Sequence, residues 1–529
     1  MKCGCRVRKR GLRHSEADQE EDSMRIADLV AALPAEDYRG AGDGDVTSVT
    51  YDSTAVTPGA CFVAIRGHTT DGHAYIADAL ACGATLIVGE EPSPPGFPAD
   101  RTYVRVADSR RELATVAATL AGQPSRRMEV IGVTGTDGKT TTSNLIDAIM
   151  TSAGRRTGLM STVDFKIGAK RWPNNTRFTT LEAPEVQELL AQMVEERVEC
   201  AIVETTSSGL ALHRVYQIAY DIAVVTNITS EHLEVHGTLE AYRRAKAMLP
   251  ESVVPDLRKD LPFVVPKACV LNRDDANFEY LKSFCRAPVL SYGIDSPADI
   301  RAEEVRLGAT GSRFRVRLPD GGAFDVESPL VARYNVANAL AALAVGYLHG
   351  LSAERMARAL KEFPGVPGRM ERIEEGQPFT VIVDYAHTAD SLEKVLRVLR
   401  PLTRNRLLVV FGSAGDRDRV KRPAMGAVAA READYAIITD EDPREEDAAS
   451  ILAEIAAGAD AAGAREGERY ERIVGRRAAI VRALSLAREG DTVLLAGKGH
   501  EQSIVIGREK LPWDDRQVAR DVLAELGYH

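Results

Sequence analysis

Short apolar runs alternate with helix-length segments along most of the chain. Each apolar run is strand-length and ends in polar or turn-forming residues, which is typical of buried strands. The predicted strands are residues 60–65, 84–88, 130–133, 201–203, 222–225, 381–383, 407–411, 435–438 and 492–496. Helices are predicted at residues 24–30, 141–150 and, from an alanine-rich stretch, 336–349. This alternation predicts an α/β protein built from layered, mainly parallel sheets.

The length of 529 residues is too great for one hydrophobic core and indicates three domains. We place an N-terminal domain at residues 24–124, a central domain at 125–364 and a C-terminal domain at 365–529. The last boundary falls in the glycine- and proline-rich segment 363–368, which is typical of a hinge. Residues 1–23 are basic and then acidic without an apolar core, so we expect a disordered extension rather than a secretory signal.

Composition and charge argue against nucleic-acid and membrane partners and favour a reducing compartment. The formal net charge of −10 argues against nucleic acid or an anionic membrane as a partner. No apolar run approaches the ~18 residues needed to cross a bilayer, so no membrane insertion is expected. The seven cysteines are scattered and odd in number, which favours free thiols in a reducing compartment. We therefore expect a cytoplasmic protein. A monomer is expected as well.

The segment Gly132-Val133-Thr134-Gly135-Thr136-Asp137-Gly138-Lys139-Thr140-Thr141 joins a predicted strand to a predicted helix. Backbone amides around such a glycine-rich turn cradle a polyphosphate, a lysine adds positive charge, and a threonine hydroxyl binds Mg²⁺. The sequence therefore predicts a nucleoside triphosphate, expected to be ATP. Its contacts are predicted to be Gly135, Thr136, Asp137, Gly138, Lys139, Thr140 and Thr141.

Polar residues also follow the next two predicted strands of the central domain. Glu204 ends one of them, where an acid completes Mg²⁺ coordination in phosphate-loop enzymes. The segment after the other strand contains His232 and His236 but lacks the glutamate spacing of zinc proteases, so a histidine near a second Mg²⁺ is favoured. Lys246 lies one helix further on, and spacing alone predicts a solvated helix face there.

Four polar loops follow four predicted strands of the C-terminal domain, at residues 384–387, 412–419, 440–444 and 497–501. Ligands of doubly wound sheets bind at the carboxyl ends of the strands, so these loops predict one binding face. Arg417 and Arg444 suit carboxylates, and Glu501 suits an ammonium group. A zwitterionic ligand is therefore expected.

These motifs together resemble the Mur ligases, and most closely the MurE type. The family shares the Gly-Thr-x-Gly-Lys-Thr loop, usually with Asn where this chain has Asp137. Residues 384–392 and 497–501 are also MurE-like, with Ala389 in place of the usual Pro. The resemblance runs from about Val46 to the C-terminus. It implies a smaller α/β UDP-binding domain, a central P-loop ATPase-like parallel sheet and a Rossmann-like domain that binds the amino acid.

The resemblance also implies residue roles. The UDP-linked substrate would contact Tyr51, Ser53, His68, Thr69, Thr70, Thr179, Thr180, Thr206 and Arg214, and the nucleotide would also contact Asn338, Arg369 and Asp384. Catalysis would depend on Lys139, Glu204, His232 and Lys246. Mg²⁺ would bind Thr140, Glu204, His232 and Lys246, the last as a carbamate, which overturns the solvated-face interpretation of Lys246. The chain departs from the family at Thr54, usually Arg, and at Ser208, usually His.

The implied reaction is ATP-dependent, ADP-forming addition of a diamino acid to UDP-N-acetylmuramoyl-L-alanyl-D-glutamate, through an acyl phosphate, in peptidoglycan synthesis. The amino-acid pocket would contain Arg417, Glu441, Asp442, Pro443, Arg444, Gly497 and Glu501. The family's diaminopimelate motif Asp-Asn-Pro-Arg reads Glu-Asp-Pro-Arg here, and Asp442 would repel a distal carboxylate unless Arg444 pairs with it. We therefore place meso-diaminopimelate only slightly ahead of L-lysine or L-ornithine.

Two other functions stay open at this stage. One is a folylpolyglutamate synthase-like ligase, which shares the loop but not the C-terminal motifs. The other is a non-catalytic or regulatory Mur-ligase paralogue, in which Thr54, Ser208 and Asp442 mark a drifted site. The retained Lys139, Glu204, His232 and Lys246 argue against the second.

Overall fold

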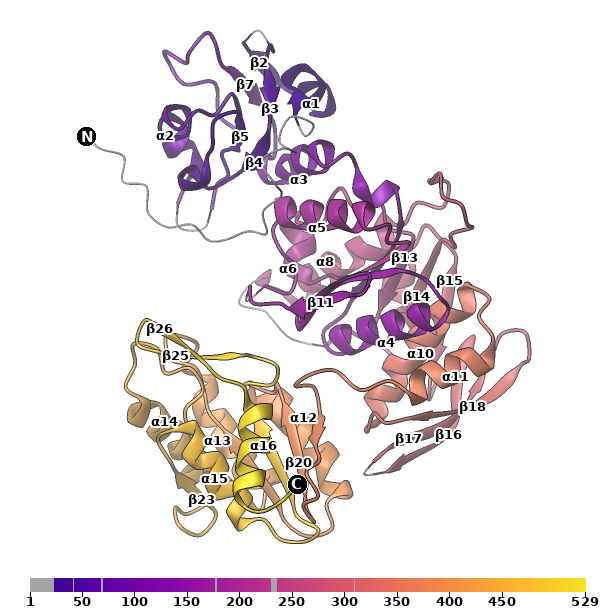
Figure 1. Cartoon of the computed structure of the whole chain (residues 1–529), viewed down its shortest axis with the longest axis vertical. Coiled ribbons are helices and arrows are strands. Elements are labelled where there is room, and N and C mark those ends of the chain that lie inside the picture. The colour runs from indigo at the N-terminus through magenta and orange to yellow at the C-terminus, as the bar shows by residue number, and fades with distance from the viewer. Residues whose placement is uncertain (1–22, 41, 68–69, 177, 230–235, 309) are drawn as a thin grey trace.

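The chain folds into three α/β domains that follow one another in sequence, each around its own sheet (Figure 1). The structure is a computed structural model that describes residues 23–40, 42–67, 70–176, 178–229, 236–308 and 310–529. The three-domain α/β class predicted from the sequence is confirmed. The boundaries after residues 23, 124 and 364 stay predictions, and residues 1–22 of the expected extension lie outside the described residues.

The N-terminal domain has a five-stranded sheet in the order β2 (Asp37–Arg39), β7 (Thr102–Arg105), β6 (Leu86–Gly89), β5 (Ala60–Val63) and β4 (Ser48–Thr50). Its helices are α1 (Ile26–Ala32), α2 (Ile76–Ala81) and α3 (Ser109–Leu120). The helix predicted at residues 24–30 begins only at Ile26. Met24 and Arg25 instead form β1 (Met24–Arg25), which pairs with β3 (Asp45–Val46), because tertiary pairing outweighs helix propensity at a frayed helix start.

The central domain has an eleven-stranded sheet with β8 (Glu129–Thr134) between β12 (Cys200–Glu204) and β13 (Ile222–Val225), all parallel. The sheet continues past β12 through β9 (Thr157–Met160), β10 (Asp164–Ile167) and β11 (Lys170–Pro173). Past β13 it continues through β14 (Ala268–Asn272), β15 (Val289–Gly293), β16 (Ile300–Gly308), β17 (Gly311–Arg317) and β18 (Ala323–Ser328).

Helices cover both faces of this central sheet, so its inner strands are apolar on both sides. One core joins the strands to α4 (Lys139–Ser152), α10 (Arg333–Leu348) and α11 (Ala353–Lys361). The opposite core contains α5 (Ala183–Glu195), α8 (Leu239–Ser252) and α9 (Phe278–Lys282), with the short α6 (Ser207–Ala211) beside α8. This layering places the strand ends of β8, β12 and β13 at one edge, where the phosphate loop lies.

The C-terminal domain has a six-stranded sheet in the order β19 (Glu371–Ile373), β20 (Thr380–Asp384), β24 (Thr492–Ala496), β21 (Leu407–Phe411), β22 (Tyr435–Ile438) and β23 (Tyr470–Arg472). Only β19 runs antiparallel to its neighbour. One core contains α12 (Ala389–Leu399), α13 (Lys421–Glu432) and α14 (Ala448–Ala461), and the other contains α15 (Arg476–Leu486) and α16 (Asp515–Glu525). A hairpin of β25 (Ser503–Ile506) and β26 (Glu509–Pro512) completes the domain.

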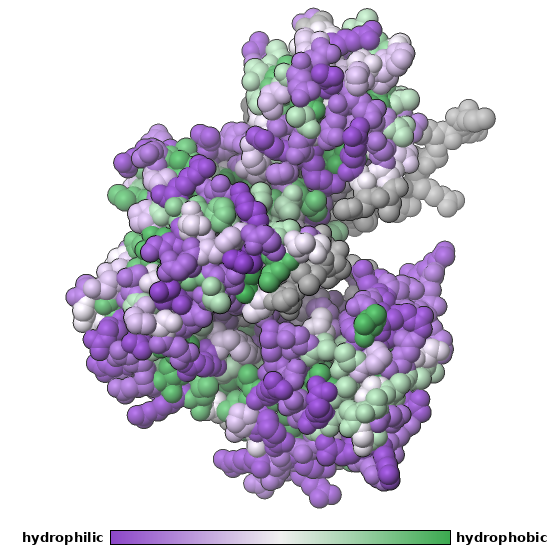
Figure 2. Space-filling view, turned by 180° about the vertical axis from the view of Figure 1, so that it is seen from behind, coloured by the Kyte–Doolittle hydropathy of each residue, from purple (hydrophilic) through white to green (hydrophobic). Residues whose placement is uncertain are grey.

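All nine predicted strands overlap strands of the structure. The helices predicted at 141–150 and 336–349 overlap α4 and α10. The face seen in Figure 2 is mostly hydrophilic and is hollowed between the N-terminal domain at the top and the C-terminal domain below. Across the described ranges, no helix is both long and apolar enough to cross a membrane. The cysteines of the same ranges are free thiols.

Candidate active site

The phosphate loop between β8 and α4 is a tight turn that only glycine allows at two positions. Gly138 has φ +83°, and a Cβ there would lie 2.3 Å from Oδ1 of Asn338 on α10. A Cβ on Gly135, with φ +151°, would lie 1.8 Å from Oγ1 of Thr226. Lys139 folds its ammonium over the loop and donates to the carbonyl oxygens of Gly135 (3.0 Å) and Thr136 (2.8 Å). Asn338 thus lies against the loop, and its contact with the nucleotide, which the family resemblance implies, stays a prediction.

The residues that follow β13 hold this loop from the other side. The Asp137 amide donates to Oδ1 of Asn227 at 3.0 Å. The Asp137 carbonyl accepts from Oγ1 of Thr226 (2.6 Å) and from Nδ2 of Asn227 (3.0 Å). The Thr136 amide donates to the Asn227 carbonyl at 2.8 Å. The loop therefore has a fixed shape that does not depend on a ligand, which is what anion binding by backbone amides requires.

Glu204 lies next to the loop and is almost completely buried. Its Oε1 accepts from the hydroxyls of Thr140 (3.0 Å) and Thr162 (2.9 Å), and its Oε2 accepts from the Thr162 amide (2.8 Å). A carboxylate and hydroxyl oxygens converging beside a phosphate loop fit a hard cation such as Mg²⁺. Thr140 and Glu204 are therefore brought together as predicted.

Thr162 is a candidate site residue that our sequence reasoning missed. It follows β9, which pairs directly with β12, so its side chain reaches Glu204 across the sheet. Its hydroxyl also lies 2.9 Å from that of Thr179. The available signal was the polar pair Ser161-Thr162 after a predictable strand, but the sequence alone does not say which strands are neighbours.

Lys246 on α8 is buried, with 1% of its surface exposed, so the solvated-face interpretation from spacing is wrong. Its Nζ donates to the Gly135 carbonyl at 2.5 Å and lies 4.6 Å from the centre of the Tyr242 ring. Helix α8 packs on the sheet at β13, which carries this lysine under the phosphate loop. His232 lies outside the described residues, whereas His236 contacts the Ser207 hydroxyl through Nε2 at 3.0 Å.

A second set of hydroxyls connects this centre to the side predicted for the muramoyl-dipeptide. Thr180 donates to the Glu204 carbonyl (3.2 Å) and accepts from the amide and hydroxyl of Thr206 (3.0 and 3.1 Å). Arg214 donates to the Thr180 carbonyl at 3.0 Å and pairs with Glu182 at 2.5 Å. The structure therefore brings Thr179, Thr180, Thr206 and Arg214 together beside Glu204.

Among the described residues predicted for the uridine side, Tyr51 lies near charged groups of the central domain. Burial, and then the nearby carboxylates of Glu185 and Glu182, raise the pKa of Tyr51 to about 12, so its hydroxyl stays a hydrogen-bond donor. Ser53 opens a 3-10 turn that Asp52 caps. His68 and Thr69 lie outside the described residues, and the Thr70 carbonyl accepts from the Gly67 amide at 2.9 Å.

The segment after the hinge brings two predicted nucleotide-binding residues together in the C-terminal domain. Asp384 accepts from the amides of Met370 (2.8 Å) and Ala386 (2.9 Å), and burial raises the pKa of its carboxyl group. The guanidinium of Arg369 lies 4.8 Å from the centre of the Tyr385 ring. That ring lies 5.0 Å from the ring of His500, so the loops after β20 and β24 meet beside the hinge.

Two loops of the C-terminal domain form an acidic pocket around a buried lysine. Lys498 is fully buried and donates to Oδ1 of Asp442 (2.9 Å) and to Oε2 of Glu501 (2.5 Å). Asp442 also accepts from the Val505 amide at 2.9 Å. Asp442 is thus paired with Lys498, whereas the sequence had left open a pairing with Arg444.

Glycine is required where these two loops approach each other. Gly497 has φ +107°, and a Cβ there would lie 3.1 Å from Oε2 of Glu441, a buried oxygen with no hydrogen-bond partner among the described residues. The loop containing Pro443 packs on the next loop, where the Gly415 amide donates to the Asp442 carbonyl at 2.8 Å. Arg417 is exposed, and neither it nor Arg444 forms an ion pair within the described part of the chain.

Comparison with known proteins gives one family along most of the chain. Residues 45–120 match the Mur ligase family catalytic domain, residues 133–346 the Mur ligase middle domain, and residues 368–499 the Mur ligase glutamate ligase domain. The UDP-N-acetylmuramyl-tripeptide synthetase of Roseiflexus sp. is 50% identical over 514 residues, 96% of this chain and 100% of that protein. The chain belongs to the Mur ligase family. It is therefore an ATP-dependent, ADP-forming amide ligase.

Two further relatives of this Mur ligase are named as 2,6-diaminopimelate ligases. The UDP-N-acetylmuramoyl-L-alanyl-D-glutamate–2,6-diaminopimelate ligase of Geobacillus kaustophilus is 42% identical over 504 residues, 95% of this chain and all of that protein. A solved structure with the same name is 31% identical, has a TM-score of 0.64, and covers 92% of this chain and 96% of that one. These relatives therefore favour a diaminopimelate ligase over the folylpolyglutamate synthase alternative.

The departures of this Mur ligase from the family pattern have local explanations. Thr54 donates its hydroxyl to Oδ1 of Asp52 at 2.7 Å, so it closes the turn instead of extending a guanidinium. The Ser208 hydroxyl lies 3.2 Å from that of Thr206, inside the hydroxyl cluster beside Glu204. Neither position disrupts the contacts among Thr140, Thr162 and Glu204.

Proposed function

We propose that this protein joins meso-diaminopimelate to the D-glutamate of UDP-N-acetylmuramoyl-L-alanyl-D-glutamate, with ATP as the energy source, in peptidoglycan synthesis. The observation that carries the proposal is the continuous contact chain Thr140–Glu204–Thr162–Thr179, because it joins the phosphate loop to the side predicted for the dipeptide. Since nucleotide-linked substrates are made inside the cell, we place the reaction in the cytoplasm.

In the proposed reaction an oxygen of the substrate γ-carboxylate attacks the γ-phosphorus of ATP, and ADP leaves. The amine of the incoming amino acid then attacks the acyl carbon of the resulting acyl phosphate, loses a proton, and inorganic phosphate leaves. Lys139 offsets charge on the transferred group, and Arg214 orients the dipeptide. When bound by Thr140 and Glu204, Mg²⁺ would neutralise phosphate charge.

The pairing of Asp442 with Lys498 supports diaminopimelate over lysine or ornithine. A buried ammonium at 2.9 Å offsets the carboxylate that would otherwise repel the distal carboxylate of diaminopimelate. Within the described residues Arg444 does not pair with Asp442, so Arg444 and Arg417 can bind a carboxylate of the substrate. The relatives named as 2,6-diaminopimelate ligases, at 38–42% identity, favour the same choice.

The test is a panel of amino acids with wild-type protein and with Asp442→Asn. Each reaction contains ATP, Mg²⁺ and UDP-N-acetylmuramoyl-L-alanyl-D-glutamate, and both phosphate release and product mass are followed. We expect turnover with meso-diaminopimelate and little with L-lysine or L-ornithine. Turnover only with a monocarboxylic diamine would overturn the choice of amino acid. No turnover by folded, ATP-binding protein would instead favour the non-catalytic paralogue.

We also propose that Lys246 is carbamylated in the active protein and then serves as an anionic ligand for Mg²⁺, with His232. Its complete burial under the phosphate loop supports the proposal, because a buried ammonium has little access to solvating water. Incubation with ¹³C-bicarbonate should give a carbamate signal in NMR spectra of wild-type protein and not of Lys246→Arg. A carbamate-free enzyme that is fully active would contradict it.

A further inference from the structure

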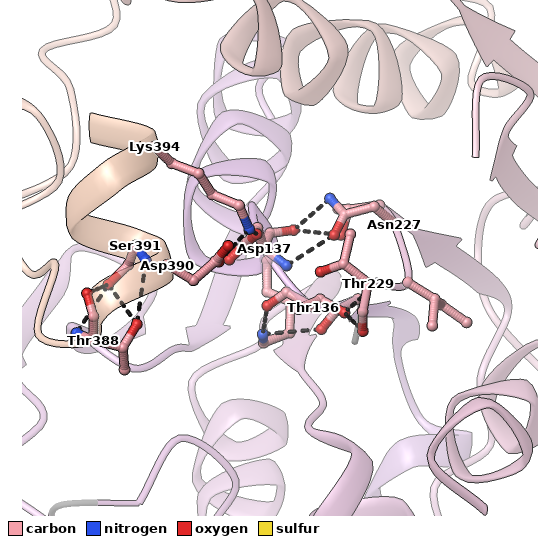
Figure 3. Close-up of polar contacts among 12 residues, drawn as sticks. Thr136, Asp137, Asn227, Thr229, Thr388, Asp390, Ser391 and Lys394 are labelled. Carbon is pink, nitrogen blue, oxygen red and sulfur yellow. Dashed lines mark hydrogen bonds and ion pairs between the residues drawn. The ribbon is translucent and has the colours of Figure 1, made fainter. Parts of the chain in front are cut away.

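An ion pair links the phosphate loop to the C-terminal domain, far away in the sequence (Figure 3). The ammonium of Lys394, on α12, lies 3.0 Å from Oδ2 of Asp137 in the loop. The same ammonium lies 2.6 Å from Oδ2 of Asp390, one turn earlier on α12. Lys394 has no role in the proposed chemistry so far, yet it is a cation that the C-terminal domain places directly on the nucleotide-binding loop.

Both ends of this ion pair are positioned by rigid structure. The amide and carbonyl of Asp137 are held by Asn227 and Thr226, which fixes the backbone from which its carboxylate extends. On the other side, Thr388 and Ser391 cap each other and fix the start of α12. The i,i+4 contact with Asp390 then holds the ammonium on the face of α12 that meets the loop. The ion pair can therefore form only when the C-terminal domain is docked on the central domain.

Charge gives this pair a consequence for nucleotide binding. A triphosphate bound on the loop carries several negative charges, and the carboxylate of Asp137 is part of the same loop. Like charges a few Å apart repel one another, and because the side chains of Asp137 and Lys394 are about half exposed, water and salt weaken that repulsion. Lys394 offsets part of this charge, because its ammonium is shared between the carboxylates of Asp137 and Asp390. Without Lys394 the carboxylate of Asp137 opposes the polyphosphate.

We propose that the Asp137–Lys394 pair couples nucleotide binding to docking of the C-terminal domain. Lys394 is then a positioning residue that acts on ATP through Asp137. Because coupling between two equilibria is reciprocal, bound nucleotide favours the docked domain and the docked domain favours nucleotide. The inference rests on ATP being the energy source of the proposed function.

A direct contact between Lys394 and a phosphate is the competing explanation, and a double-mutant cycle separates the two. If Lys394 acts through Asp137, its removal matters only while the carboxylate is present. If Lys394 binds phosphate directly, its removal weakens binding equally with Asp137 or with Asn at that position.

The experiment measures Kd for ATP, ADP and AMP by calorimetry on the full-length protein with Mg²⁺. The variants are Lys394→Met, Asp137→Asn and their combination. Arg397→Met is the matched control, because Arg397 is on the same helix but pairs with Glu393 and Glu432 inside its own domain. Lys394→Arg tests whether a different cationic side chain at this position preserves the affinity for ATP.

We expect Lys394→Met to weaken ATP binding about 2- to 5-fold, because the paired side chains are about half exposed, with a smaller loss for ADP and the smallest for AMP. In the Asp137→Asn background the loss should disappear, and Arg397→Met should bind as the wild type does. Lys394→Met and Asp137→Asn should each raise the radius of gyration of the nucleotide-free protein in X-ray scattering.

Equal losses in both backgrounds, or unchanged affinity in Lys394→Met, would overturn the coupling. Those outcomes leave the ligase proposal intact, since ATP still binds. Absence of ATP binding by folded wild-type protein would instead remove the proposed function itself.

Discussion

At the scale of single residues, Glu204 has the contacts that best define the candidate active site. It ends β12, is 1% exposed, and joins the hydroxyls of Thr140 and Thr162 through one carboxylate. A buried carboxylate with that surrounding is stable only if hydrogen bonds or a cation compensate its charge. The carboxylate of Glu204 therefore serves the structure, by accepting hydrogen bonds from Thr140 and Thr162, and the chemistry, by offering a ligand to a cation.

We expect Glu204→Gln to lower turnover by more than about 100-fold, because the amide is a poor Mg²⁺ ligand that nevertheless keeps the shape of the side chain. Phosphate release at increasing Mg²⁺ concentration measures the effect. Glu199→Gln is the control, since Glu199 directly precedes the same strand but pairs with Arg155, and its turnover should stay within about 2-fold. Turnover of Glu204→Gln within about 10-fold of the wild type would argue against a metal role.

At the scale of elements, the loops of the amino-acid pocket are held by one buried arginine at the start of α15. Arg476 pairs with Asp515 at 2.5 Å, and neither side chain is exposed. It also donates to the carbonyls of Asp440 (3.1 Å), in the loop after β22, and of Ala496 (2.8 Å), the last residue of β24. Arg476 thus fixes the spacing of the loops that contain Asp442 and Lys498.

Arg476→Met should destabilise the protein by about 3–5 kcal/mol, because it leaves the buried carboxylate of Asp515 without its partner. Arg477→Met is the matched control: it removes an exposed pair with Glu525 and should cost less than about 1 kcal/mol. Urea denaturation of both variants measures the difference. Equal stability of the two would show that Asp515 is compensated by other groups.

A contact between α10 and β8 makes the free energy of unfolding depend on pH. Nε2 of His349, which ends α10, lies 2.7 Å from Oε1 of Glu129 on β8. Burial favours the neutral ring, but the hydrogen bond and charge of Glu129 outweigh it and raise the pKa of His349 above 6.5. Stabilisation by the charged pair is therefore complete below pH 6.5 and is lost as the pH rises through the raised pKa.

The wild type should accordingly lose stability relative to the uncharged double variant Glu129→Gln/His349→Gln as the pH rises from about 6 to about 9. Denaturant titrations at each pH measure the difference in the free energy of unfolding. A constant difference across that range would show that His349 does not titrate there.

At the scale of the whole molecule, the site exists only where the domains meet. The segment 363–368 leaves α11 and enters the C-terminal domain, and Gly368 lies against the loop after β24. Its φ is +64°, and a Cβ there would lie 2.0 Å from the His500 amide nitrogen. The hinge is therefore packed directly on the loop that contains Lys498 and Glu501.

We expect Gly368→Ala to lower both turnover and thermal stability. Gly365→Ala is the control, because it has a similar φ of +90° but open space around the added Cβ. Both variants bear the left-handed backbone cost of about 1–2 kcal/mol, and only Gly368→Ala adds the clash. Indistinguishable melting temperatures and turnover would mean that the hinge adapts freely.

The sequence by itself determined the elements and the local chemistry. Strand positions follow from apolar runs, because burial on both faces of a parallel sheet requires them. The phosphate loop is equally local, since its glycines, Lys139 and Thr140 are consecutive. Glu204 was predictable for the same reason: it ends a strand that the pattern already identified.

Only the tertiary structure decided which residues meet. Thr162 reaches Glu204 because β9 lies beside β12, and sheet order is not encoded in any local pattern. Lys246 is buried although its spacing predicts exposure, Asp442 pairs with Lys498 rather than Arg444, and Lys394 reaches Asp137 from another domain. Such pairs depend on the packing of distant segments, so the physical reason is that contact and burial are non-local, whereas periodicity and turn chemistry are local.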